Sequence, residues 1–286
     1  MVRSWEESGA IARLTKELAD WPGVVLNSHK SAGQLYHKLA FLADIGITHS
    51  DPGMPRVIDR IFQFTSEEGP FQLVTRPFNP GGEPQAERRA WALCDAPSIV
   101  CSLARMGLSN DPRVLKARDY LLELARPNGF PCAVSKELGN WRGPGKKTDP
   151  CPYATLLMLK LISVYPDLIE SRAAQDSVEC LLHLWENSRT LKPYIFYMGT
   201  DFRKLKAPFI WYDILHVADT LSYFPQARTD PRYRDMISHI TAKAGPDGRY
   251  TPESVWQAWK EWDFGQKKVP SDGLTWLIDR MIRRIL

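Results

Sequence analysis

The segment NDPRVLKARDYLLELARPNGF, Asn110 to Phe130, contains the signals that decide the fold. Asp111, like Asp230 in a later copy of this segment, is of a type that caps helices, because its carboxylate accepts a hydrogen bond from a backbone N–H in the first turn. Pro112 then takes the first helical position, where a missing N–H costs nothing. Gly129 is typical of the stop at the end of a helix. The segment therefore predicts one capped helix.

Similar segments recur along the chain. They are SDPGMPRVIDRIFQFTSEEGPF (Ser50 to Phe71), TDPRYRDMISHITAKAGPDGRY (Thr229 to Tyr250) and a degenerate copy, ESRAAQDSVECLLHLWENS, which begins at Glu170. The matching anchor residues, 57, 59 and 60 residues apart, are Pro55, Pro112, Ser171 and Pro231. Gly69 and Gly248 match Gly129 and are likewise expected to stop their helices. A period of this size indicates a helical repeat protein.

A second helix is expected before each copy, and a final one ends the sequence. The segments that would form these helices are apolar nearly all round, as in YATLLMLKLISVY, which predicts helices buried on several sides. We expect these helices at about 31–45, 90–106, 152–164, 209–224 and 271–286. Inner and outer helices that alternate predict an all-α fold, an α/α toroid of repeated hairpins with about ten to twelve helices. An open superhelical solenoid is the alternative.

Length and composition set the broad class. The 286 residues, 44% hydrophobic and 24% charged, fit a single globular domain over 1–286, in which 1–30 is an N-terminal extension with a first helix packed on the rest. The net charge of +4 and the lack of RNA-binding motifs argue against a nucleic-acid partner. Acidic residues in MVRSWEESGAIARLTKELAD and the lack of a long apolar run predict a cytoplasmic protein without a membrane span.

Residues of types that can bind a metal or take part in catalysis fall at one level of the inner helices. Counting 18 residues back from each anchor gives His37, Cys94, Tyr153 and Asp213. Close to them in the sequence are Asp95, Cys151, Trp211, Tyr212 and His216. Cys, Asp and His are ligands of zinc. The five cysteines do not indicate a disulfide framework, and Cys101, Cys132 and Cys180 are expected to be packing thiols.

Basic residues precede every inner helix, where unpaired backbone amides already favour an anion. They include His29 and Lys30 and, further along, Arg142, Lys146, Lys147, Arg203, Lys204 and Lys206. The pattern indicates a phosphate or diphosphate site, although each cation alone would also fit a solvated loop. Trp91, Trp211 and Tyr212 are expected to line an apolar pocket, or else to belong to the core.

The repeat resembles that of the terpenoid cyclase and protein prenyltransferase superfamily, including the squalene–hopene cyclase-like proteins, over about 30–286. This resemblance implies a toroid whose site lies at the N-terminal ends of the inner helices. RGPGKKTDPCPY (Arg142 to Tyr153) resembles the zinc segment of prenyltransferase β subunits, which implies Asp149 and Cys151 as ligands and Lys146 as a diphosphate contact. Arg142 is displaced by one position, and the third ligand is His216 or Asp213.

These observations favour an enzyme that uses zinc to act on an isoprenoid or another apolar diphosphate. Asp95, Asp213, Cys94 and Tyr153 are the catalytic candidates. Two alternatives stay open: a carbohydrate-active enzyme that uses Asp95 and Asp213 as its carboxylate pair, and a non-catalytic protein that binds an anionic lipid or partner. No Asp-x-Asp-Asp motif, Asp-Asp-x-x-Asp motif or P-loop is present, which disfavours the reactions that depend on them.

Overall fold

The computed structural model describes residues 5, 9–76 and 86–286, and these are mostly helical. Eleven α-helices, α2 to α12, lie in this part of the chain. The outer helices begin at the repeat anchors or within one residue of them. They are α4 (Met54–Phe62), α6 (Pro112–Leu122), α8 (Arg172–Glu186) and α11 (Pro231–Thr241). The inner helices are α3 (Leu35–Asp44), α5 (Ala96–Leu103), α7 (Pro152–Ile162), α9 (Ile214–Leu221) and α12 (Asp272–Ile285). Two further helices are α2 (Ala10–Leu18) and the short α10 (Pro225–Thr229).

Two outer helices have the predicted aspartate caps, and a third is capped by Ser171, which the repeat had aligned with the anchor prolines. The side chains of Asp111, Ser171 and Asp230 each accept a hydrogen bond from a backbone N–H two or three residues later, at 2.8 to 3.2 Å. The first copy differs, because Gly53 takes the N-cap position of α4. The carboxylate of Asp51 instead accepts from Thr48 in the preceding turn. The local sequence pattern therefore sets where most of these helices begin.

The predicted role of the three glycines was wrong. Helices α4, α6 and α11 end at Phe62, Leu122 and Thr241, each seven residues before its glycine. Gly69, Gly129 and Gly248 lie in the turns that follow, with φ of +124°, +108° and +75°. They allow a left-handed backbone in the connection rather than stopping the helix.

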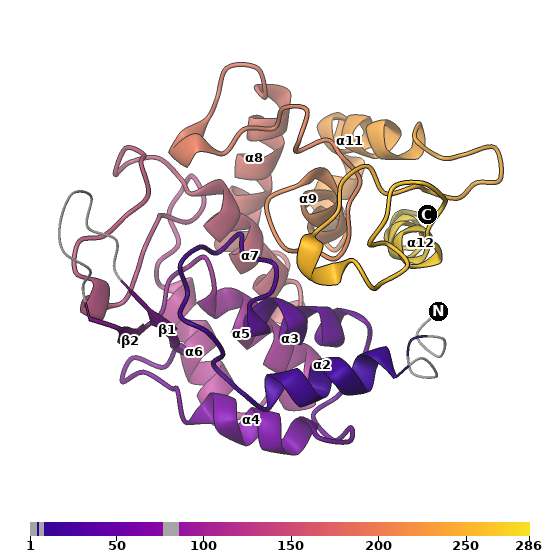
Figure 1. Cartoon of the computed structure of the whole chain (residues 1–286). Helices are drawn as coiled ribbons and strands as arrows, with labels where there is room; N and C mark the ends of the chain where they lie inside the picture. The colour runs from indigo at the N-terminus through magenta and orange to yellow at the C-terminus, as the bar shows by residue number, and fades with distance from the viewer. Residues whose placement is uncertain (1–4, 6–8, 77–85) are drawn as a thin grey trace.

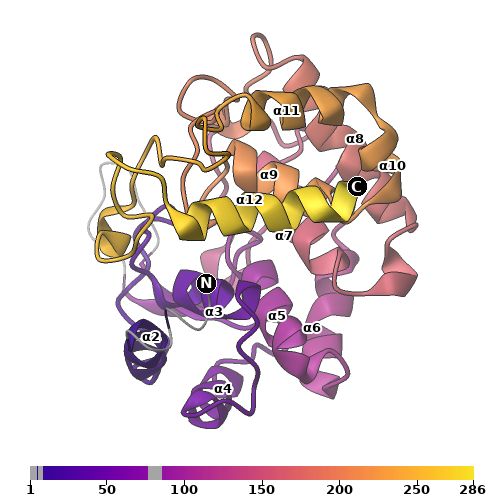
Figure 2. The same cartoon turned by 90° about the vertical axis from the view of Figure 1, so that its right-hand side faces the viewer.

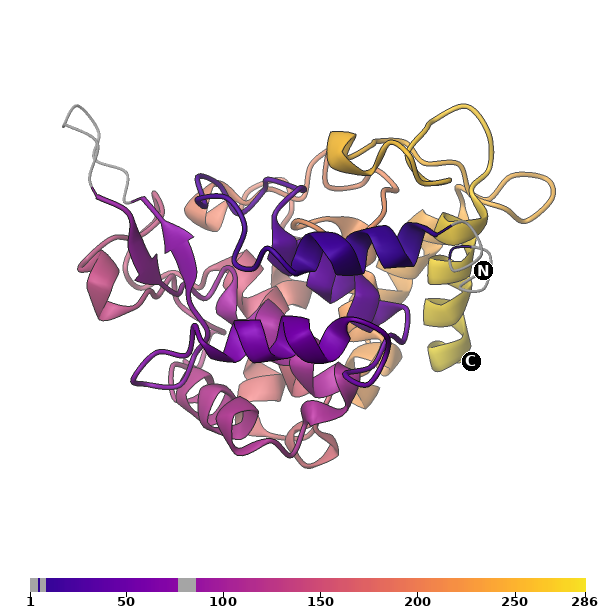
Figure 3. The same cartoon turned by 60° about the horizontal axis from the view of Figure 1, so that its bottom comes forward.

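Three inner helices begin later than predicted, among them α3, which starts at Leu35 rather than near residue 31. Residues Arg88–Ala90 form a strand, β2, that pairs antiparallel with β1 (Leu73–Thr75), so α5 starts at Ala96 rather than near residue 90. Extended backbone and turns also occupy 209–213 before α9. Figure 3 shows the small two-stranded sheet at the edge of the molecule.

The inner helices follow one another in space (Figures 1 and 2). Outer helices flank the first four, whereas α12 crosses the front of Figure 2 with no other described helix over it and is buried along one face only. Helix α5 packs between α3 and α7, and α9 packs against both α7 and α12. Arg280 of α12 donates to the backbone carbonyl of Asp44 at the end of α3, which joins the last inner helix to the first. Within the described ranges, no helix combines the length and apolar content needed to cross a membrane.

Candidate functional site

A hydrogen-bonded pair of side chains, His29 and Asp95, lies at the start of α5. Asp95 occupies the N-cap position of this helix and is 2% exposed. One of its carboxylate oxygens accepts from the backbone N–H of Ala92 at 3.1 Å, and the other lies 2.8 Å from Nε2 of His29. Asp95 was among the predicted catalytic residues, whereas His29 was expected only as one of the basic residues.

The loop that carries His29 is held in place by α3. The backbone carbonyl of His29 accepts from the hydroxyl of Tyr36 at 2.9 Å and from Nε2 of His37 at 2.8 Å. Burial is the main cause that lowers the pKa of His37 to about 3, so this imidazole is neutral near pH 7. Both the side chain and the backbone of His29 are therefore fixed.

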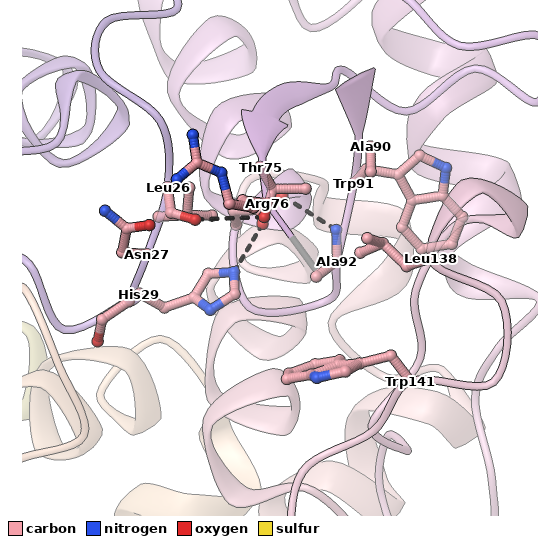
Figure 4. Close-up of a pocket in the computed structure, with 12 residues that line it drawn as sticks. Leu26, Asn27, His29, Thr75, Arg76, Ala90, Trp91, Ala92, Leu138 and Trp141 are labelled. Atoms are coloured by element: carbon pink, nitrogen blue, oxygen red, sulfur yellow. Dashed lines mark hydrogen bonds and ion pairs between the residues drawn. The ribbon is translucent and has the colours of Figure 1, made fainter. Parts of the chain in front are cut away.

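The His29–Asp95 pair forms part of the wall of a small pocket, which we call the His29 pocket (Figure 4). Its volume is about 90 Å³, enough for a small molecule or for one end of a larger one. The other walls are the 26–28 segment, the ends of both strands and the loop after β2. Besides the His29–Asp95 pair, the charged and aromatic side chains that line it are Arg76, Trp91 and Trp141. Figure 4 shows the indole of Trp141 across the open space from the imidazole of His29.

The hydrogen bonds of the pair fix the role of each ring nitrogen. An ionised Asp95 can only accept, so Nε2 of His29 must carry the proton that it donates. The neutral ring then has its lone pair on Nδ1, which has no hydrogen-bond partner among the residues that the structure describes. A histidine with one nitrogen on a carboxylate and the other free is arranged to accept a proton from a ligand or from water.

The two predicted thiols, Cys94 and Cys151, are not among the residues that line this pocket. Cys151 is 2% exposed and occupies the N-cap position of α7, and Cys94 precedes Asp95. The neighbouring Cys94 thiol is the main cause that lowers the pKa of Cys151, and backbone N–H groups at the start of α7 add to this against the effect of burial. The same contact and burial raise the pKa of Cys94.

Three predicted aromatic residues lie away from the His29 pocket. Tyr153 is 1% exposed, donates to the backbone carbonyl of Ile210 at 2.9 Å, and packs against Trp211 with 4.3 Å between ring centroids. Tyr212 is also buried, whereas Trp211 is half-buried. Tyr153 and Tyr212 belong to the hydrophobic core and Trp211 packs against it, as the alternative interpretation of these residues expected.

Asp213 and His216 lie inside the helical layers. Asp213 is fully buried and one of its oxygens caps α9 by accepting from the backbone N–H of His216 at 3.0 Å. The His216 ring is stacked on Phe209, with Nδ1 3.0 Å from the carbonyl of Trp211. Burial is the main cause that lowers the pKa of His216 to about 3. Asp213 does not line the pocket that contains Asp95, so the two carboxylates do not share one groove.

The ligand set predicted for zinc does not come together. In the described part of the chain, no group of three Cys, His, Asp or Glu side chains is placed to hold a metal ion. Asp149 lines a separate pocket of about 580 Å³ against α8, Cys151 contacts Cys94, and His216 is packed on Phe209. The helices that carry these residues are neighbours, but the side chains point into different surroundings. These residues do not fit a zinc ion.

The predicted cations do not form one ring either. Lys206 is buried, and both it and Lys204 pair with Asp201, each at 3.5 Å. Arg203 lies over the ring of Trp185 and donates to Ser188. Lys146 lines the pocket against α8, and Arg142 and Lys147 are exposed. Most of the cations near residue 205 are therefore already paired with a neighbouring carboxylate or packed against an aromatic ring.

Sequence reasoning missed two members of the His29 pocket, Arg76 and Trp141, which lie in loops without a repeat signal. It named His29 as one of the basic residues but did not pair it with Asp95, which is 66 residues away. Asp95 was predicted because it adjoins Cys94, which lies 18 residues before a repeat anchor, and Trp91 because it lies near a predicted start of an inner helix.

Comparisons with known proteins add little to this description. No family model matches the chain, and no curated protein matches it. Among solved structures, the chain is similar to the crystal structure of a protein from Actinoplanes, with 15% sequence identity and a TM-score of 0.41, over 97% of this chain and 83% of that one.

Proposed function

We propose that the chain is an enzyme that acts on a small organic anion in the His29 pocket, with His29 as the general base and Asp95 as the group that orients it. The single observation that carries the proposal is the 2.8 Å hydrogen bond between a nearly buried carboxylate and a histidine on the wall of a pocket. Proton transfer by a positioned histidine contributes about 10²- to 10⁴-fold to a rate.

The other side chains of the pocket indicate the class of ligand. Trp141 is 37% exposed and presents an indole to the open space, which suits an apolar or flat body. Arg76 supplies a cation at the edge, where it also pairs with Glu87 at 2.8 Å. An isoprenoid diphosphate belongs to this class and is the ligand that the sequence resemblance suggests. No step of the proposal passes through zinc.

We infer also that the inner helices close into an α/α toroid, with the His29 pocket at its rim. The bond from Arg280 to the end of α3 supports closure, because it links the last inner helix to the first. The N-cap position of Asp95 supports the placement of the pocket at the N-terminal ends of the inner helices.

The experiment combines calorimetric titration with an assay of product release. Geranyl diphosphate is the probe, inorganic diphosphate tests the charged part alone, and methyl β-glucoside tests an uncharged flat face. We expect geranyl diphosphate to bind, and Trp141→Ala to weaken it about tenfold, which corresponds to about 1.4 kcal/mol. Tyr197→Ala is the matched control, because Tyr197 is an exposed aromatic residue, at 46%, outside the pocket.

Activity separates catalysis from binding. We expect release of inorganic diphosphate from geranyl diphosphate to fall about 10²-fold or more in His29→Ala and in Asp95→Asn. Binding without turnover in the wild type would contradict the catalytic role and favour the binding protein. Binding of the glucoside in place of the two anions, or equal effects of Trp141→Ala and Tyr197→Ala, would contradict the assignment of the ligand.

A further inference from the structure

Three of the five cysteines come from separate segments that the backbone holds side by side. The N–H of Leu93 donates to the carbonyl of Ala133 at 3.0 Å, which places Cys94 beside Cys132. The N–H of Cys151 donates to the carbonyl of Phe130 at 2.7 Å, which brings the start of α7 to the same place. The cluster formed by Cys94, Cys132 and Cys151 was not expected from the sequence, where Cys132 was a packing residue.

Within this cluster, the thiols of Cys94 and Cys151 are near enough that each shifts the pKa of the other. Cys151 takes the N-cap position of α7, an 11-residue helix. The Cys94 thiol is the main cause that lowers the pKa of Cys151, and the backbone N–H groups in the first turn of α7 lower it further. A helix N-terminus favours the thiolate, which is the nucleophilic form of cysteine. Cys94 and Cys132 are half-buried, so solvent reaches the edge of the cluster.

The remaining two cysteines have other surroundings. Cys101 is 2% exposed and its thiol donates to the carbonyl of Lys160 at 3.5 Å. Cys180, at 8%, packs beside Gly129 and Thr155. Neither is hydrogen-bonded to another thiol in the described residues. Cys101 and Cys180 therefore serve as internal controls for the reactivity of the cluster.

We propose that Cys94 and Cys151 are a redox-active pair that forms a reversible disulfide when a peroxide oxidises it. The sulfur of Cys151 attacks one oxygen of hydrogen peroxide and the O–O bond breaks. The hydroxide that leaves takes up a proton as water, and Cys151 becomes a sulfenic acid. The sulfur of Cys94 then attacks that of Cys151, the S–O bond breaks, and the second hydroxide leaves with the Cys94 proton as water. Two thiols lose two electrons, which reduce one peroxide to two waters.

The disulfide would join the segments that begin α5 and α7. Cys94 directly precedes Asp95 in the chain, so the disulfide would lie next to the carboxylate that orients His29. The inference does not depend on the proposed function, because the pair is defined by its own contacts.

The test is a peptide map of the full chain after treatment with hydrogen peroxide, under non-reducing conditions. Trypsin releases Cys94 and Cys101 on one peptide, residues 90–105, so the map is made on Cys101→Ser as well as on the wild type. Cys151 lies on 148–160 and Cys132 on 119–136, because the bond from Arg126 to Pro127 resists trypsin. We expect peptides 90–105 and 148–160 to be linked, with loss of two of the five thiols and full recovery by dithiothreitol.

A variant tests the order of the steps. In Cys94→Ser the link should be lost and dimedone, a reagent for sulfenic acids, should label Cys151. Cys132→Ser should keep the link. Five free thiols after peroxide treatment would overturn the proposal, as would a link that joins Cys132 to Cys151 or that persists in Cys94→Ser. Where a variant fails to fold, the wild-type map still shows whether peptides 90–105 and 148–160 are linked, and fragmentation of the linked peptides in the mass spectrometer tells Cys94 from Cys101.

Discussion

At the scale of single residues, Asp213 has the most unusual environment. Its side chain is fully buried, one oxygen caps α9, and the other oxygen has no partner among the described residues. Burial is the main cause that raises the pKa of Asp213 to about 7, and the charge of Lys206 and the backbone N–H groups offset it only in part. The folded protein therefore binds a proton that the unfolded chain has already lost above about pH 4.

The consequence is a loss of stability as pH rises. Between about pH 4 and pH 7 the unfolded state ionises Asp213 and the folded state does not, so this residue lowers the free energy of unfolding across that range. Asp213→Asn keeps a capping side chain but cannot ionise. We expect the stability of the variant relative to wild type to rise by at most about 4 kcal/mol between pH 4 and pH 8. Urea denaturation at both pH values measures it, and an unchanged difference would contradict the assignment.

At the scale of elements, the turn after α6 depends on close approach of the backbone to α7. Gly129 has φ of +108°, and a Cβ atom there would lie 2.8 Å from Oγ1 of Thr155 and 3.2 Å from Sγ of Cys180. Gly248 occupies the equivalent turn after α11 with φ of +75°, and a Cβ atom there would meet nothing within 4 Å.

The two glycines make a matched pair. A left-handed backbone costs a residue with a Cβ about 1 to 2 kcal/mol, and we expect Gly248→Ala to lose about this much stability. Gly129→Ala should lose a further 1 to 3 kcal/mol or so, because the added methyl group overpacks the contact with Thr155. Thermal and urea unfolding of both variants provide the comparison. Equal losses would mean that the turn relaxes away from α7.

At the scale of the whole molecule, a buried charge network links the far ends of the inner helices. Asp44 at the end of α3 pairs with Lys160 of α7 at 2.7 Å and with Arg105 after α5. Arg280 of α12 donates to its backbone carbonyl. Burial alone would raise the pKa of Asp44, but the charges of these cations outweigh it and hold the pKa well below its ordinary value.

Removal of this carboxylate should destabilise the fold as a whole. Asp44→Asn leaves Lys160 and Arg105 without their anion, and breaking a buried pair in this way costs about 3 to 5 kcal/mol. Asp176→Asn is the control, because Asp176 pairs with the exposed Arg172 within α8, where such a pair is worth about 0.3 to 0.5 kcal/mol. Urea denaturation near pH 7 measures both losses. A similar effect of the two variants would show that the network contributes little.

Local signals account for what could be predicted of the site and the fold. Asp111 and Asp230 were recognised as caps because the residues that set a helix start lie within one turn of it. The repeat period then placed Asp95, Cys94 and Cys151 at one level. Residues 209–213 were misjudged because their apolar composition fits a buried helix as well as a buried extended segment.

The sequence by itself determined that the chain forms alternating inner and outer helices, because capping and apolar periodicity act within one or two turns. Only the tertiary structure decided which polar side chains meet. His29 reaches Asp95 and Cys94 reaches Cys151 through loops whose course depends on packing, and the proposed zinc ligands separate for the same reason. Repeat spacing fixes the level of a residue along the helices, but the direction of its side chain depends on every neighbour that packs against it.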